Sequence, residues 1–272
     1  MNMKTRNTKK NISLKEINPH PRDNFIKFYN EGHIYDVKGD RSFTSVTTFV
    51  HRLFPYFDEN KIIDKMMNSS NWKNNKYYGK TKQQIKDLWK INRIESTTLG
   101  TALHEYIEDF YNNKQFTEKQ IKNFNNYIEY NYFYDFYNNH KDLLPFRTEW
   151  MIYHEYYKIS GSVDMTFINN DGTISIYDWK RCKKIETENP FGKFAKYPNF
   201  DLDDNNYTHY SLQLNIYKFI IEDKYNHKIK DMFLIAMHPD NENNSYIKIE
   251  VPNMQEKVKE LLNTHYETKV KN

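Results

Sequence analysis

The sequence predicts an α/β fold in which helices cover both faces of a mixed β-sheet. Three observations lead to this prediction: a helical pattern ahead of residue 140, three strand-like runs after Pro145, and a further helix followed by more strands. This order of elements is typical of an α/β domain. The 272 residues are enough to bury a substantial core, as one large domain or one domain with insertions.

The chain opens with a basic segment. Its first ten residues hold four basic side chains and no acidic one, and Pro19 and Pro21 lie near its end. We expect residues 1–24 to be a disordered tail; a localisation signal or a loose phosphate contact is the alternative. The rest of the chain holds 36 basic and 36 acidic side chains. Any nucleic-acid binding must therefore use a local patch.

Residues 25–95 are expected to be mainly helical. A small hairpin turned at residues 38–40 comes first, and Ser45 or Thr47 caps the helix after it. Residues 58–95 are polar and largely helical, with an interruption near residues 77–79.

We expect a core over about residues 96–251 and a C-terminal helix over 252–272, so residues 25–272 form a single domain. In the core, Thr97 or Thr98 caps a helix that runs to about Tyr111. The remaining expected elements of the core are a helix at 117–139, strands at 146–155, 160–168 and 173–181, a helix at 208–224, and strands near 231–238 and 245–251.

Two of these strands form a β-hairpin with two acidic residues. The turn lies near residues 169–172, where Gly172 can adopt positive φ. If residues 170–172 form a three-residue loop, Asp164 falls directly opposite Asp178; other loop registers move this by one residue. Opposed side chains lie about 5 Å apart at Cβ, and two carboxylates at that distance are typical of a divalent-cation site.

Lys180 shares the strand face of Asp178 and adds a positive charge beside the acidic pair. The alternative is a solvated hairpin whose three charges neutralise one another.

Candidate side chains also flank the hairpin. His104 lies one position from the apolar stripe of its helix, and Gln213 and Tyr217 share one helix face. Taken alone, His104 is more typical of a packed or surface histidine than of a ligand, and Gln213 and Tyr217 are more typical of an ordinary amphipathic edge. Glu149, on the strand before the hairpin, could face the same site.

The single cysteine, Cys182, excludes a disulfide framework and a four-cysteine zinc or iron–sulfur site within one chain. The longest apolar run, residues 232–237, is too short to span a bilayer. We therefore expect an intracellular protein with no membrane partner. The cytoplasm, the nucleus and a viral factory are not distinguished.

Four motifs in order resemble those of RecB-like nucleases of the PD-(D/E)xK superfamily. They are Gly100 with His104, Gly161 with Asp164, Asp178 with Lys180, and Gln213 with Tyr217. Together they cover about residues 95–222. The set is most similar to the branch that holds the mitochondrial genome maintenance exonuclease and proteins of large DNA viruses. Because the chain has one cysteine, it resembles the members without an iron–sulfur cluster.

The resemblance implies a restriction-endonuclease-like core and metal-dependent hydrolysis of phosphodiester bonds in DNA. It implies Mg²⁺ or Mn²⁺ held by His104, Asp164, Asp178 and the Trp179 carbonyl, with Lys180 acting on the attacking water. Gln213 and Tyr217 would position the strand. The implied partner is DNA, single-stranded or with free ends, together with replication or repair proteins.

Arg181, Lys183 and Lys184 follow the hairpin and are candidate phosphate contacts; a solvated basic turn is the alternative. For the whole chain, an exonuclease is expected. The other hypotheses are a structure-specific endonuclease and a catalytically silent nucleic-acid-binding subunit. Silent members of such families usually lack an acidic residue or the lysine, and this chain has all three.

Overall fold

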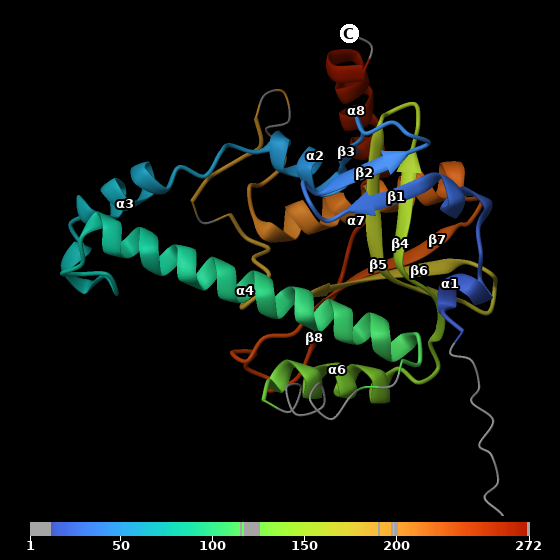
Figure 1. Cartoon of the computed structure of the whole chain (residues 1–272). Coiled ribbons are helices and arrows are strands. Elements are labelled where there is room, and N and C mark those ends of the chain that lie inside the picture. The colour runs from blue at the N-terminus through green and yellow to red at the C-terminus, as the bar shows by residue number, and fades with distance from the viewer. Residues whose placement is uncertain are drawn as a thin grey trace, which may run out of the picture.

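The structure, a computed structural model, describes residues 12–114, 116, 126–189, 191–196, 198 and 201–270. Among these residues, six strands form one mixed sheet and two more form a separate hairpin (Figure 1). None of the described helices is long and apolar enough to cross a membrane. The elements are α1 (Leu14–Ile17), η1 (Pro21–Phe25), β1 (Ile26–Tyr29), β2 (Ile34–Val37), β3 (Thr44–Ser45), α2 (Val46–Leu53), α3 (Glu59–Met67), η2 (Trp72–Asn74), α4 (Lys82–Tyr111), α6 (Ile128–Asn139), β4 (Leu144–His154), β5 (Ile159–Ile168), β6 (Ile174–Lys180), α7 (Asn206–Lys224), β7 (Ile229–Ala236), β8 (Ile247–Glu250), α8 (Gln255–His265) and η3 (Tyr266–Val270).

The sheet confirms the expected α/β architecture. Strands β4, β5, β6, β7 and β8 are neighbours in that order, and β6 and β7 run parallel. Two apolar clusters lie on opposite faces, because successive side chains of a strand alternate. In β6, Ile174 and Ile176 pack with α2, α7 and α8, whereas Tyr177 and Trp179 pack with α4 and α6.

Strand β5 has two different partners along one of its edges, and we call the place where they part the fork. The first edge of β5 pairs with β4 along its length. The second edge pairs with β3 at Ile159 and Ser160 and with β6 from Met165 onward. Residues 161–164 lie between these two partners. The fork therefore leaves a short unpaired stretch of strand edge in the middle of the sheet, and Asp164 is its last residue.

The N-terminal residues differ from the expected tail. Residues 14–17 form α1 and residues 21–25 form the 3₁₀ turn η1, so the prediction of disorder is wrong for 12–24. Leu14 is buried and its N–H donates to Asn112, and Asp23 pairs with the buried Arg147 at 2.8 Å. These long-range contacts order a segment that has little periodicity of its own. Residues 1–11 lie outside the described residues.

Two other predictions need correction. The two-stranded N-terminal hairpin is β1–β2, which turns at residues 30–33. The expected turn at 38–40 is present, but it is closed only by a bridge between Val37 and Asp40 and does not join two strands. Helix α4 is continuous for 30 residues from its cap at Thr81, and Thr97 and Thr98 lie inside it. A threonine is a good N-cap but only a weak helix breaker, so the chain around it decides. Ser45 caps α2 as expected. The part of the predicted helix 117–139 that precedes residue 126 lies outside the described residues.

Candidate metal and nuclease site

The hairpin β5–β6 has the register that the sequence predicts. Gly172 has φ +80° and its N–H donates to the Asn169 carbonyl at 2.9 Å, which closes a three-residue loop. Met165 pairs with Tyr177. The next position along both strands therefore places Asp164 opposite Asp178.

Asp164 lies at the fork of β5 and replaces a ladder bond with its side chain. Its Oδ2 accepts a hydrogen bond from the Trp179 N–H at 3.0 Å. Burial raises the pKa of Asp164 to about 7, and the neighbouring carboxylate of Asp178 acts in the same direction. His104 and Lys180 oppose this rise in the pKa of Asp164, because positive charge beside the two carboxylates offsets their mutual repulsion.

His104 reaches the same place from helix α4. Its Nε2 lies 2.8 Å from the Trp179 carbonyl oxygen, and its Nδ1 lies 3.5 Å from Asp164 Oδ2 and 3.9 Å from Glu149 Oε1. Burial alone would lower the pKa of His104, but the two carboxylates outweigh it and raise that pKa to about 9. The histidine therefore faces acidic groups rather than an apolar core.

Glu149 completes the cluster from strand β4. Its backbone has φ +40°, which is uncommon for a residue with a side chain. Its carboxylate accepts a hydrogen bond from Ser162 Oγ at 2.8 Å. One ligand atom from each of His104, Glu149 and Asp164 can be chosen so that all lie within 4.8 Å of one another, a spacing that could hold a metal ion. Strained backbone often marks a functional site.

Asp178 and Lys180 lie beside this cluster on β6. Asp178 is buried, and Lys180 Nζ lies 2.5 Å from its Oδ2 and 4.6 Å from the centre of the Tyr210 ring. Burial lowers the pKa of Lys180, but Asp178 and Asp164 outweigh it and raise that pKa. Asp178 Oδ1 is buried and has no hydrogen-bond partner among the described residues.

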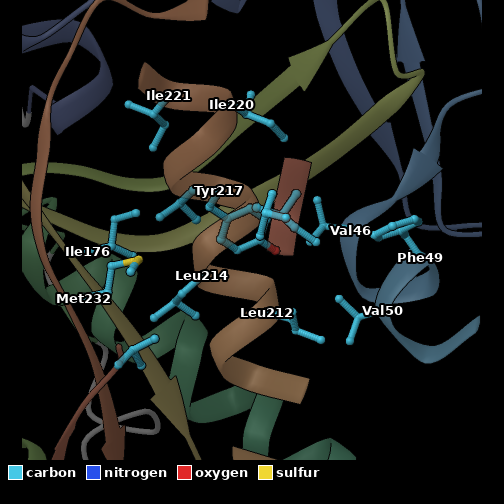
Figure 2. Close-up of a cluster of buried hydrophobic side chains, with 14 of the residues drawn as sticks. Val46, Phe49, Val50, Ile176, Leu212, Leu214, Tyr217, Ile220, Ile221 and Met232 are labelled. Atoms are coloured by element: carbon cyan, nitrogen blue, oxygen red, sulfur yellow. The ribbon is translucent and has the colours of Figure 1, made fainter. Parts of the chain in front are cut away.

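Gln213 and Tyr217 connect the site to the core through helix α7. Gln213 Nε2 donates to the Tyr217 hydroxyl at 3.0 Å and to Thr47 Oγ1 at 3.3 Å. Figure 2 shows Tyr217 surrounded by aliphatic side chains of α2, α7 and the sheet. A Cβ at Gly161 would lie 2.6 Å from Tyr217 Cε1. Gly161 is therefore the residue that admits this ring.

The three basic candidates after the hairpin lie in different surroundings. Arg181 is largely buried, and its Nε donates to the buried Glu129 at 2.6 Å. Lys183 and Lys184 are exposed and form ion pairs with Asp240 and Glu186. Lys183 and Lys184 remain accessible to a phosphate, whereas Arg181 has a partner inside the protein.

Of the expected metal ligands, the structure groups His104 and Asp164 with Glu149. Asp178 lies one strand over, paired with Lys180. The sequence analysis missed the roles of Ser162 and Tyr210. Their signals were present: Ser162 directly follows Gly161, and Tyr210 lies one helical turn before Gln213.

No protein-family model matches the chain, and no curated protein is similar to it in sequence. Among solved structures, it is similar to a protein described as SSO0001. The identity is 14%, the TM-score is 0.36, and the match covers 85% of this chain and 77% of the other. A similarity this low carries no argument about fold family or function.

Proposed function

We propose that this protein is a divalent-metal-dependent DNA nuclease with a restriction-endonuclease-like core. In this proposal it belongs to the RecB-like branch of the PD-(D/E)xK superfamily and acts as an exonuclease on single-stranded or tailed DNA. The observation that carries the proposal is the approach of His104, Glu149 and Asp164 within 4.8 Å, with the Asp178–Lys180 pair beside them.

The donor set fits a hard divalent cation. Glu149 and Asp164 supply carboxylate oxygens, and His104 supplies an imidazole nitrogen, which favours Mn²⁺ over Mg²⁺. The buried, unpartnered Oδ1 of Asp178 is a further oxygen beside the cluster. When bound, a divalent cation supplies stabilisation of charge on a phosphate and a lowered pKa for water.

The other residues would act on the substrate. Lys180 is held by Asp178 and by the Tyr210 ring, so its ammonium has a fixed position for orienting water or offsetting charge at a phosphate. Gln213 is tied to Thr47 and Tyr217, which orients its amide. These contacts preorganise polar groups, and such preorganisation is a main source of catalytic stabilisation.

The test uses linear single-stranded DNA with Mn²⁺, with and without a chelator. We expect chelator-sensitive cleavage, and its loss in Lys180→Ala and in Asp178→Ala with little change in DNA affinity measured in Ca²⁺. Lys230→Ala is the matched control, because Lys230 lies on β7 outside the site. Near wild-type cleavage by either site variant would refute the proposal.

A covalently closed single-stranded circle separates the two nuclease classes, because an exonuclease leaves it intact. Binding in Ca²⁺ without cleavage of any DNA in Mn²⁺ would favour the catalytically silent subunit instead.

A further inference from the structure

A cavity of about 560 Å³ lies directly beside the metal cluster. Its walls come from the β1–β2 hairpin, from α1, from the C-terminal end of α4, and from β4 and β5 (Figure 1). The volume falls within the range of about 300–1,000 Å³ that is typical of small-molecule and cofactor sites. A single nucleotide is a ligand of that class.

The cavity and the metal cluster share Glu149. Glu149 and Ser162 both line the cavity, and the Ser162 hydroxyl donates to Glu149 Oε2. The other carboxylate oxygen, Oε1, lies 3.9 Å from His104 Nδ1. A ligand in the cavity would therefore have one end at the cluster.

The hairpin wall is aromatic. The ring centre of Phe28 lies 4.9 Å from that of His33 and 4.8 Å from that of Tyr35. Phe28 is half-buried and His33 is exposed, so both can offer ring surface to a ligand, whereas Tyr35 is buried beneath them. Base–aromatic stacking is tolerant of sequence, because every base has a π-face.

Cationic side chains also line the cavity. Lys15 is exposed and forms no ion pair with any residue that the structure describes. Lys114 pairs with Asp109, and Arg147 pairs with Asp23. Lys15 is therefore the lining cation with an uncommitted charge, as the phosphate of a nucleotide requires.

We propose that this cavity binds the terminal nucleotide of a DNA strand. The base packs on Phe28 and His33, and Lys15 contacts a phosphate. The phosphate that joins the terminal nucleotide to the rest of the strand lies at the cluster containing Glu149. This inference rests on the proposed function and adds to it a reason for end dependence: a strand without an end has no terminal nucleotide to place there.

The test measures binding in Ca²⁺ and so does not depend on cleavage. Two DNA ligands of the same sequence are used, one linear and one circular, each with an internal fluorophore that leaves the ends of the linear strand free. Binding of dAMP and dTMP to the unsubstituted protein is measured by calorimetry. The variants are Phe28→Leu, His33→Asn and Lys15→Gln.

Each variant removes a cavity contact with little risk to folding. Asparagine tolerates the positive φ of His33, which is +53°. Leucine at position 28 keeps an apolar side chain in the hairpin. The matched control is Tyr29→Leu, because adjacent residues of a strand point to opposite faces and Tyr29 does not line the cavity. Melting temperatures verify that each variant is folded.

We expect Phe28→Leu and His33→Asn each to weaken binding of the linear strand and of the mononucleotides about five-fold or more. Lys15→Gln should weaken both and reduce their salt dependence. Each variant should bind the circular DNA as tightly as the unsubstituted protein does. The control Tyr29→Leu should bind all of these ligands with unchanged affinity. If only the Phe28→Leu variant is unfolded, the binding results for the exposed positions Lys15 and His33 test the proposal.

Equal binding of the linear strand by the variants and the unsubstituted protein would overturn the cavity proposal. So would an equal loss for linear and circular DNA, or no binding of either mononucleotide by the unsubstituted protein. Failure of the nuclease proposal has a different signature, which is intact DNA after incubation with Mn²⁺ while these binding differences persist.

Discussion

Replacing Gly161 by alanine tests whether this glycine makes room for Tyr217. The added Cβ would lie 2.6 Å from Tyr217 Cε1, 3.2 Å from the hydroxyl oxygen and 3.3 Å from Cζ. The ring must retreat by about 0.8 Å to restore ordinary contact at 3.4 Å. Tyr217 is 3% exposed and packed on aliphatic side chains, so it has little room to move (Figure 2).

The expected cost follows from two opposing effects. Overpacking a filled core costs about 1–3 kcal/mol. The loss of backbone freedom in the unfolded chain offsets about 0.4–1 kcal/mol of this. We therefore expect Gly161→Ala to lower the free energy of unfolding by about 1–2 kcal/mol.

Chemical denaturation of a double-mutant cycle measures the effect. In the Tyr217→Leu background the ring is gone, so Gly161→Ala should be neutral or slightly stabilising. In the Tyr217→Phe background the clash with Cε1 remains, so the cost should persist. A helical glycine with free space provides a control of opposite sign. No atom lies within 4 Å of a Cβ built on Gly100, so Gly100→Ala should stabilise α4 by about 0.5–1 kcal/mol.

Two results would refute this reasoning. The first is a Gly161→Ala protein as stable as the unsubstituted one. The second is a cycle in which the effects of the two substitutions simply add, because additivity would mean that Gly161 and Tyr217 do not compete for the same space.

Three further predictions concern single side chains. Arg181→Gln should lower the free energy of unfolding by about 3 kcal/mol, because it leaves the buried Glu129 without its cation; unchanged stability in denaturant with weaker DNA binding would instead assign Arg181 to the DNA. His104→Ala should weaken Mn²⁺ binding in calorimetry with little change in metal-free melting temperature; a large loss of metal-free stability at unchanged Mn²⁺ affinity would indicate a packing role. Burial lowers the pKa of His154 from 6.5 to about 4, so below pH 6.5 the unfolded state takes up a proton that the folded state refuses. Stability should therefore fall as pH drops from about 6.5 towards 4, and His154→Gln should reduce that slope in urea titrations at several pH values.

Local signals explain why much of the sheet could be predicted from the sequence. The three central strands lie within two residues of their expected bounds. Both signals used for them, the period-two alternation and the turn at Gly172, depend only on residues that are close together in the sequence. The facing of Asp164 and Asp178 follows from the same local turn.

Other features depend on contacts between distant residues. The Arg181–Glu129 pair joins residues 52 positions apart, so nothing near Arg181 in the sequence indicates that it is buried. Likewise, no local pattern around Glu149 indicates its positive φ, although its strand position allowed it to face the same site as His104. Helix α4 passes through Thr97 because the flanking helical residues outweigh a local capping preference.

Helix α4 also constrains how this protein can diverge. Residues 94–98 are all exposed within it. They separate His104 from the N-terminal portion of the helix, which the Lys82–Asp64 and Arg93–Glu59 ion pairs tie to α3 (Figure 1). A single inserted residue in that exposed stretch would turn the α3 end by about 100° around the helix axis relative to His104, whereas seven would return it to within about 20°. Point substitutions in this stretch should change the free energy of unfolding little, because none of its side chains is buried. Insertions or deletions in this stretch should therefore be tolerated in multiples of about seven residues, which is two helical turns. The rotation of the α3 end about the helix axis relative to His104 would then stay the same even where the sequence between them changes.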